Sequence, residues 1–228
     1  MRLKHDSKAF FFLLLAVIAS IIVPYIINQA FSSSAPMLST FQTIFNIAIL
    51  FLILICEALV TFSLAKREAS SEFASSKLNG LTSALLLVGF GALPPIIDSY
   101  FLHFFTVDSN SVFVIGNIVL VSGSVVRLLA IRELNGFFNH SLVLYDSHQV
   151  ISTGIYSKVR HPAYLGTLLI FIGFSLSYKS FASFLLLGLV LFYILRRIRA
   201  EEAMLESRLL ESYRAYKRRS FRLIPFVI

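Results

Sequence analysis

The stretch ISTGIYSKVRHPAYLG, Ile151–Gly166, is the one polar and chemically varied run between two long blocks of apolar sequence. Pro162 suits the first position of a helix, because its missing N–H would have no intrahelical partner there. The stretch therefore predicts a loop that leads into a helix. The amides beyond Pro162, together with Arg160 and His161, would hold a carboxylate or a phosphate. Taken alone, Arg160 and His161 also fit a lipid-headgroup anchor at a helix start.

The composition places the chain among polytopic membrane proteins. Of its 228 residues 57% are apolar and only 14% are charged, and the mean hydropathy is +0.81. Twenty Lys and Arg against twelve Asp and Glu give a net charge of +8. The cations cluster beside apolar runs. This position favours a role in setting membrane topology and binding anionic lipid over a role in binding nucleic acid. Cys56 is the single cysteine and no Cys/His spacing fits a metal, so we expect no metal site.

Apolar runs recur along the whole chain. Four precede the motif stretch and two shorter ones follow it: residues 9–27, 41–65, 80–104, 112–131, 163–177 and 181–195. Because a bilayer core of about 30 Å needs about 20 helical residues, we expect an all-α polytopic membrane protein with about six transmembrane helices. Residues 1–111 would hold three N-terminal spans, the third kinked or broken at Pro94 and Pro95. Residues 112–228 would form the second unit, which contains the motif stretch.

The two runs after the motif stretch are short for spanning helices, at about 21–24 Å each. We interpret them as a helical hairpin joined by residues 178–180. The next segment, Ile198–Tyr216, has an apolar face at helical spacing and is predicted to continue the second hairpin helix as a cytosolic amphipathic helix. It should fold back against the motif loop. The residues of that face are Leu205, Leu209, Tyr213 and Tyr216.

Cations alternate from one inter-helix segment to the next. They occur at the N-terminus, at 66–79, at 132–161 and at 196–199, whereas the segments 31–40 and 105–111 contain none. By the positive-inside rule both termini and the motif loop are predicted to be cytosolic. We therefore expect an integral, multi-pass protein whose site faces the cytosol.

Several motifs in the second half of the chain occur together in one family. They are Gly154-x-Tyr156-x-x-x-Arg160-His161-Pro162-x-Tyr164-x-Gly166, Glu201-Glu202-x-x-Leu205, Tyr213-x-x-Tyr216 and Leu223-Ile224-Pro225. This pattern resembles the integral-membrane methyltransferases typified by isoprenylcysteine carboxyl methyltransferase and phospholipid N-methyltransferase. The resemblance covers about half the chain, residues 116–228. The chain departs from the family at Leu209-Leu210, where Phe-Gly is usual, and at Ile155, where Pro is common.

The resemblance implies a methyltransferase core at 112–228 that uses S-adenosyl-L-methionine, a donor with a carboxylate, an ammonium, a ribose diol and an adenine. Arg160, Glu201 and Glu202 are the expected catalytic residues, because positioning and charge dominate transfer from a sulfonium. The expected cofactor-binding residues are Tyr156, Arg160, His161, Pro162, Tyr164, Gly166, Glu201, Glu202 and His140. His148 is a further candidate. From residue physics alone, Glu201 also fits a solvated pair with Arg197.

The acceptor is expected to be a membrane lipid or a lipidated molecule that reaches the cytosolic site from the bilayer. Arg127, near the end of the fourth span, either extends to the membrane surface or pairs with an acceptor carboxylate. Glu57, deep in the second span, either forms a protonated interhelix hydrogen bond or lines an access route. A prenylcysteine carboxyl acceptor is favoured over a phospholipid amine. The remaining alternatives are an NADPH-dependent membrane reductase and a non-catalytic membrane protein.

Overall fold

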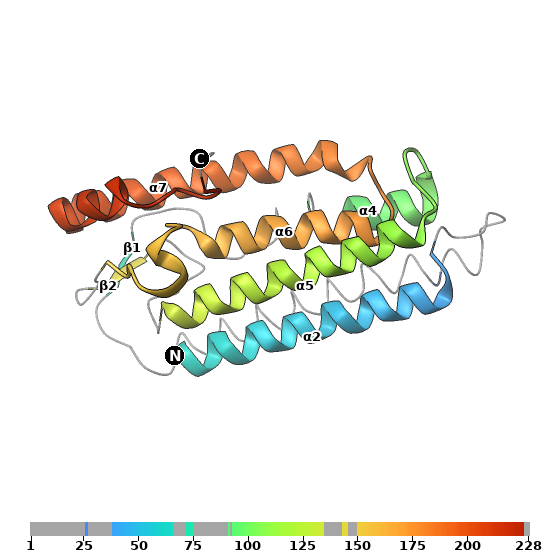
Figure 1. Cartoon of the computed structure of the whole chain (residues 1–228), viewed down its shortest axis with the longest axis horizontal. Coiled ribbons are helices and arrows are strands. Elements are labelled where there is room, and N and C mark those ends of the chain that lie inside the picture. Colours follow the sequence, from blue (N-terminus) through green and yellow to red (C-terminus); the bar gives the residue numbers. More distant parts are fainter. Residues whose placement is uncertain are drawn as a thin grey trace.

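The structure, a computed structural model, describes residues 26, 38–65, 72–74, 91, 93–134, 143–145 and 150–225. Four long helices lie side by side with their axes aligned (Figure 1). They are α2 (Thr40–Ala65), α5 (Asn110–Glu133), α6 (Pro162–Ser177) and α7 (Ser183–Arg218). The predicted all-α class is confirmed apart from two short antiparallel strands, β1 (Glu72–Ala74) and β2 (Val143–Tyr145), which the sequence did not indicate.

Helix α5 matches the predicted fourth span closely. It begins after Ser109, whose hydroxyl accepts a hydrogen bond from the Val112 amide at 3.5 Å and so caps the helix. Within the described residues it is the one helix both long and apolar enough to cross a membrane, and two shorter apolar helices cover Thr40–Ile53 and Pro162–Ser177. The predicted span at 9–27, apart from residue 26, and residues 80–90 and 92 of the predicted span at 80–104 lie outside the described residues.

Four glycines allow α5 and α6 to pack closely and antiparallel. A Cβ atom at Gly116 would lie 2.3 Å from the Ser177 backbone nitrogen, and one at Gly173 would lie 2.3 Å from the Leu120 nitrogen. Gly123 and Gly166 make close approaches of 2.7 Å nearer the other end of the pair. In a bilayer the solvent is as apolar as the side chains, so such close backbone approach replaces the hydrophobic effect as the source of helix association.

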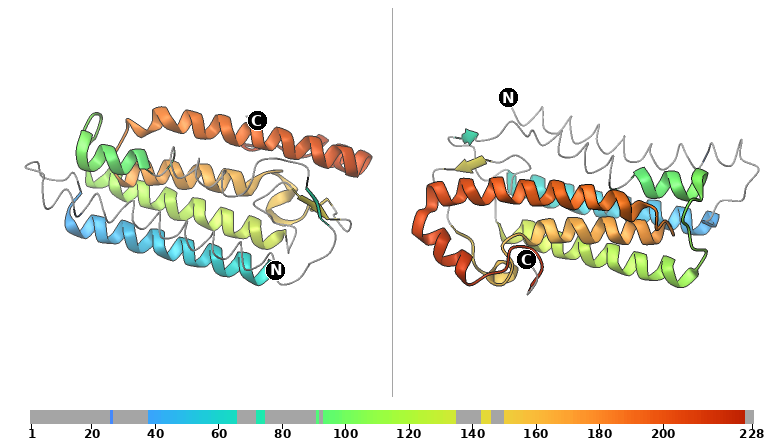
Figure 2. Two further views of the ribbon diagram at one scale, coloured as in Figure 1. Left: turned by 180° about the vertical axis from the view of Figure 1, so that it is seen from behind. Right: turned by 90° about the horizontal axis from the view of Figure 1, so that it is seen from above.

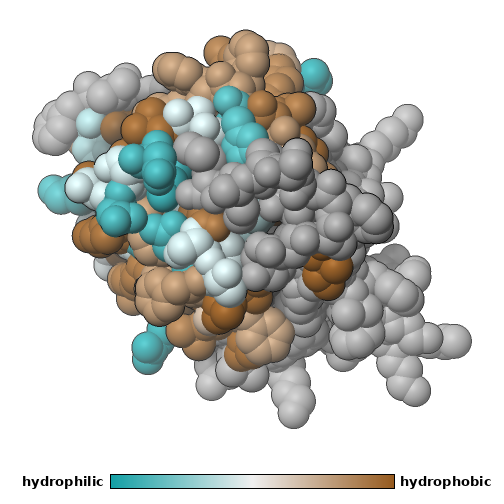
Figure 3. All heavy atoms as spheres, turned by 90° about the vertical axis from the view of Figure 1, so that its right-hand side faces the viewer, coloured by the Kyte–Doolittle hydropathy of each residue, from teal (hydrophilic) through white to brown (hydrophobic). Residues whose placement is uncertain are grey.

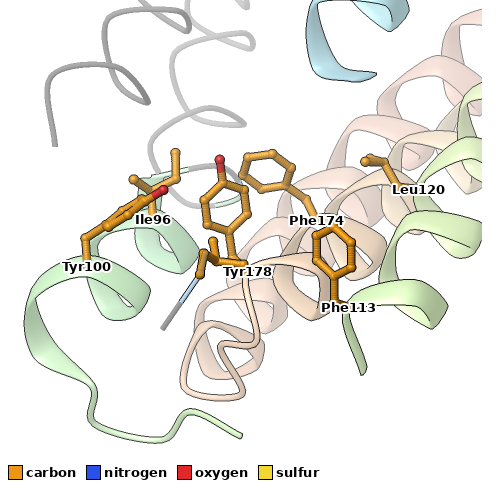
Figure 4. Packing of buried hydrophobic residues seen from close by; sticks show 7 residues of the cluster. Ile96, Tyr100, Phe113, Leu120, Phe174 and Tyr178 are labelled. Carbon is orange, nitrogen blue, oxygen red and sulfur yellow. The ribbon is translucent and has the colours of Figure 1, made fainter. Parts of the chain in front are cut away.

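We call the end of the bundle that carries the Arg160 loop the motif end, and the other the far end. At the far end α4 (Leu93–Ile97) continues directly into a π-helical turn, η2 (Asp98–Leu102), and α6 is joined to α7. Pro94 and Pro95 lie in the first turn of α4. A buried cluster joins α4, η2, α5 and α6 there (Figure 4): Ile96, Tyr100, Phe113, Leu120, Phe174 and Tyr178.

The connections at the far end are fastened by hydrogen bonds. The buried Asp98 carboxylate accepts from the Phe104 amide at 2.9 Å and from the Ser180 hydroxyl at 2.6 Å. Lys179 donates to the exposed Asp108 at 2.7 Å. Viewed end-on, this end carries hydrophilic and hydrophobic residues next to one another (Figure 3).

The predicted helical hairpin is confirmed, because α6 ends at Ser177 and α7 begins at Ser183. Helix α7 has 36 residues, and the part before Leu210, Ser183–Leu209, by itself extends for about 40 Å, which is longer than a bilayer core. Its expected continuation through Ile198–Tyr216 is right except at Leu210, whose φ of 41° and ψ of −118° interrupt the helix. The turns beyond Leu210 bend back towards the loop before α6 (Figure 2, right).

Candidate functional site

The motif loop lies against the C-terminal tail of the chain. The amides of Arg160 and His161 donate to the carbonyl oxygens of Phe221 and Arg222, at 2.8 and 3.2 Å, and the Phe221 amide donates to the Lys158 carbonyl at 2.8 Å. These three bonds make a short strand-like pairing between segments some sixty residues apart. The backbone of the C-terminal tail therefore holds the loop in place. No side-chain pattern in the sequence predicts this backbone pairing.

Glu202 lies at the centre of a buried ion cluster, the Glu202 cluster, with Arg160, His161 and Arg222. Its Oε1 atom is 2.9 Å from Arg160 Nε and 3.3 Å from His161 Nε2. Its Oε2 atom accepts from Arg222 Nε at 3.1 Å and from Nη2 at 3.0 Å. The Glu202 side chain is only 5% exposed. The loop, α7 and the tail are thus joined through one carboxylate.

The electrostatics of Glu202 follow from these partners. Burial alone would raise the pKa of its carboxyl, but hydrogen bonds from His161, Arg160 and Arg222 outweigh burial and lower the pKa to about 2. Glu202 is therefore ionised at neutral pH, and a carboxylate with such a low pKa is too weak a base to deprotonate an amine.

Arg160 has a second set of partners at the end of α7. Its Nη1 atom donates to the Lys217 carbonyl at 3.0 Å and to the Ser220 carbonyl. Carbonyls at the end of a helix lack intrahelical partners, and a cation there is also favoured by the helix dipole. The guanidinium is thus engaged by protein groups on several sides, which is the environment of a residue that positions α7 against the loop.

Tyr164 and Glu201 form a second polar group on the adjoining faces of α6 and α7. The Tyr164 hydroxyl accepts from Arg197 Nε at 2.7 Å and donates to Glu201 Oε2 at 3.0 Å. Glu201 therefore does not form the simple solvated pair with Arg197 that their spacing suggested, because a tyrosine hydroxyl connects them. Both glutamates of the predicted pair lie at the motif end: Glu201 contacts Tyr164, and Glu202 contacts Arg160 and His161.

Tyr156 belongs to η3 (Gly154–Ser157), the 3-10 turn in which the motif stretch begins. Its ring is buried, and its carbonyl oxygen accepts from the Tyr216 hydroxyl at 2.7 Å. Tyr213 lies beside Tyr216, with ring centroids 6.1 Å apart, and is also buried. The last turns of α7 therefore cover the start of the motif loop, as the amphipathic pattern predicted.

The start of helix α6 and the helix α5 next to it hold three more of the expected site residues. Pro162 is the first residue of α6, as predicted, but the Tyr164 amide donates to the His161 carbonyl at 3.1 Å and so already has a partner. Arg127 donates to the Thr167 hydroxyl at 2.9 Å. Gly166 packs directly on the Arg127 backbone, where a Cβ atom would be 2.8 Å from its nitrogen. The last two contacts join α5 to α6.

Gly154 sets the path of the chain into η3. Its φ of +50° favours glycine, and a Cβ atom there would lie 2.8 Å from the Glu133 carboxyl carbon. Glu133 in turn accepts from the Thr153 hydroxyl at 2.5 Å. A hollow of about 540 Å³, lined by Leu129, Arg132, Glu133, Gly154 and Ile155, lies at this junction. The beginning of the loop thus leaves open volume beside the end of α5.

Three expected site residues have no described side chain: His140, His148 and Glu57. Their assignments stay predictions. Conversely, sequence reasoning assigned no role to Arg222 or Ser220. The only local signal was the neighbouring Leu223-Ile224-Pro225, which marks the tail but not its partners.

Comparisons with known proteins show what part of the chain is similar to. The sequence profile described as the isoprenylcysteine carboxyl methyltransferase (ICMT) family matches residues 115–207. A protein-S-isoprenylcysteine O-methyltransferase of Schizosaccharomyces pombe is 32% identical over 111 residues, 47% of this chain and 47% of that protein. Its counterpart in Saccharomyces cerevisiae is 28% identical over 158 residues, 66% of each chain. The chain thus spans about half to two thirds of the length of these curated relatives.

The fold also has a solved counterpart. The structure of a eukaryotic intramembrane Ras methyltransferase, ICMT, superposes with a TM-score of 0.58, covers 99% of this chain and 84% of its own, and is 21% identical. Together with the apolar helix α5, this likeness supports a polytopic membrane fold.

Proposed function

We propose, from the match of residues 115–207 to the isoprenylcysteine carboxyl methyltransferase family, that the protein is an integral-membrane methyltransferase that uses S-adenosyl-L-methionine. The observation that carries the proposal is the Glu202 cluster, in which the motif loop and the double glutamate meet at 2.9 Å. Methyl transfer from a sulfonium needs two reactants held in line among fixed charges, and a rigid, buried ion cluster is suited to holding the walls of such a site.

Within this site the residues divide into two groups. Arg160, Glu202 and Arg222 fix the loop, α7 and the tail, since their contacts are with one another and with helix-end carbonyls. Glu201 is half-buried, and one of its oxygens receives the Tyr164 hydroxyl. We assign Glu201, Tyr164 and His161 to the donor, with Arg160 and Glu202 acting mainly as positioning residues.

The acceptor is a carboxylate on a prenylated cysteine. A carboxylate is already nucleophilic at neutral pH, whereas a phospholipid amine must first lose a proton to a base. The low pKa of Glu202 argues against Glu202 as the base that would deprotonate the amine. Arg127, within electrostatic range of the Tyr156 hydroxyl and bonded to Thr167, supplies a cation that can attract the acceptor carboxylate at the membrane end of the site.

The orientation of the protein follows from the same arrangement. The C-terminal ends of α2 and α5 and the motif loop lie at one end of the bundle (Figure 1). Exposed cations gather there, at Arg132, Lys158, Arg196 and Arg199. We therefore place the motif end and both termini in the cytosol. Residues 1–111 would form the N-terminal spans and residues 112–228 the catalytic core, with about six transmembrane helices in all.

The test uses membranes containing the full chain, methyl-labelled S-adenosyl-L-methionine and a small N-acylated S-prenylcysteine with a free carboxylate. We expect base-labile label in the prenylcysteine and none when its carboxylate is already esterified. Label that resists base and enters amine phospholipid would replace this acceptor with a lipid amine. No label in any extracted lipid or protein, with the protein folded, would contradict the proposed activity.

A further inference from the structure

Tyr213 has the one buried tyrosine hydroxyl at the motif end that lacks a hydrogen-bond partner among the described residues. The residue is 2% exposed and lies on the last turns of α7, which the break at Leu210 directs towards the motif loop. Its neighbours differ in this respect. The Tyr216 hydroxyl donates to the Tyr156 carbonyl, and the Tyr164 hydroxyl lies between Arg197 and Glu201.

A buried hydroxyl without a partner is costly. Removing it from water without a compensating hydrogen bond costs about 1–3 kcal/mol, and a phenylalanine would fill the same space without that cost. Packing therefore accounts for the ring of Tyr213 but not for its oxygen. A partner that the described protein does not supply would account for both.

The charges around Tyr213 restrict what that partner is. Burial, followed by the carboxylate of Glu202, raises the pKa of the Tyr213 hydroxyl well above its usual value, and Glu201 adds to this while Arg160 opposes it. The hydroxyl is therefore protonated, and its hydrogen needs an acceptor that the described residues do not supply. Glu201 and Glu202 both lie within electrostatic range of this hydroxyl, so a neutral partner that accepts from Tyr213 and can also donate to a carboxylate fits best.

Of the polar groups of S-adenosyl-L-methionine, the carboxylate is anionic, the ammonium accepts no hydrogen bond, and each adenine nitrogen either accepts or donates but does not do both. A ribose hydroxyl can accept from Tyr213 and donate to a neighbouring carboxylate, and an acidic side chain is a common partner of a nucleotide ribose. Resting on the function proposed above, we propose that the Tyr213 hydroxyl binds the ribose diol of the methyl donor, with Glu201 as the acidic partner on the same diol.

The first experiment compares two variants that each remove one hydroxyl. Tyr213→Phe should weaken binding of S-adenosylhomocysteine to the purified full chain about tenfold, as expected for one buried hydrogen bond. Its melting temperature without ligand should equal or exceed that of the wild type, because no internal bond is lost. Tyr216→Phe is the matched control, and it should lower the ligand-free melting temperature because it loses the bond to the Tyr156 carbonyl.

The second experiment uses S-adenosylhomocysteine analogues that lack one ribose hydroxyl. The wild type should lose affinity for at least one of them, and Tyr213→Phe should show no further loss with that analogue. Unchanged affinity in Tyr213→Phe, or a ligand-free melting temperature that falls as in Tyr216→Phe, would overturn the inference. If Tyr213→Phe lost as much affinity for the analogues that lack a ribose hydroxyl as for S-adenosylhomocysteine itself, the assignment to ribose would be overturned. Failure of the wild type to bind S-adenosylhomocysteine would instead contradict the proposed function.

Discussion

A buried carboxylate fastens the connections at each end of the bundle, but its partners differ between the ends. At the far end Asp98 accepts from an amide and a hydroxyl, both neutral. At the motif end Glu202 is surrounded by two arginines and a histidine. Neutral donors are sufficient to close a turn.

The charged arrangement at the motif end is therefore more than the fold requires. Removing several charges from water costs free energy that their mutual attraction often only offsets, so a buried ion cluster is a poor way to gain stability. It does fix three distant segments in one geometry with a defined charge pattern. The far end of the bundle therefore closes the connections between helices, whereas the motif end holds charged side chains in fixed positions.

The largest expected effect comes from removing the central charge. Glu202→Gln keeps the shape of the side chain but leaves Arg160 and Arg222 without their counter-charge, a change that typically costs about 3–5 kcal/mol. We expect methyl transfer to fall by a factor on the order of 100 or more, together with a clear drop in melting temperature. Asp98→Asn, the matched change at the far end, should cost about 1 kcal/mol of stability and leave the activity of the folded protein unchanged. Similar losses of activity in both variants would remove the distinction between the ends.

Gly116 and Gly166 test whether close packing serves the two ends differently. Alanine at Gly116 would bring a Cβ atom to 2.3 Å from the Ser177 nitrogen, and alanine at Gly166 to 2.7 Å from the Gly123 carbonyl oxygen. Each should destabilise the protein by about 1–3 kcal/mol. Only Gly166→Ala should also weaken binding of S-adenosylhomocysteine, because it displaces the start of α6.

Gly188 provides the control for these substitutions, since a Cβ atom there would meet nothing within 4 Å. Gly188→Ala should raise the melting temperature slightly, through its higher helix propensity. Weaker ligand binding in Gly116→Ala as great as in Gly166→Ala would indicate that packing is coupled along the whole helix pair.

The pH dependence of the protein's stability should reflect the protonation of Glu202 at the motif end. The pKa of Glu202 is lowered to about 2 from its ordinary value of 4.5, so the cluster contributes its full stability above pH 4.5 and loses it as the pH falls from 4.5 towards 2. Melting temperatures measured between pH 7 and pH 3 should fall for the wild type. Glu202→Gln should begin lower and show a shallower decrease, and parallel curves would contradict the assignment.

The smallest expected effect concerns the break in α7. The φ of Leu210 is 41°, a conformation that glycine adopts readily and leucine does not. Leu210→Gly should relieve about 1–2 kcal/mol of strain and lose about half of that to the greater freedom of the unfolded chain. We expect a rise of one or a few degrees in melting temperature with ligand binding unchanged. A fall would show that the Leu210 side chain contributes packing that outweighs the strain.

Local sequence patterns were sufficient to predict the positions of several helices. The apolar run at 112–131 predicted α5 to within two residues at each end, because hydrophobic length and a serine cap are properties of the sequence itself. Pro162 predicted the start of α6 for the same reason. The break at Leu210 was not predicted, although it falls where the related family usually has Phe-Gly, because leucine gives no local signal for a positive φ.

The candidate site divides in the same way. The resemblance to the family implied that Arg160, His161 and Glu202 would act together, but not that Arg222 and the Ser220 carbonyl would complete their partners. The sequence by itself determined which segments are apolar enough to form helices and where each begins, since those depend on neighbours along the chain. Only the tertiary structure decided which charges meet, because a carboxylate takes whichever cations the packed helices bring within reach, regardless of their separation in sequence.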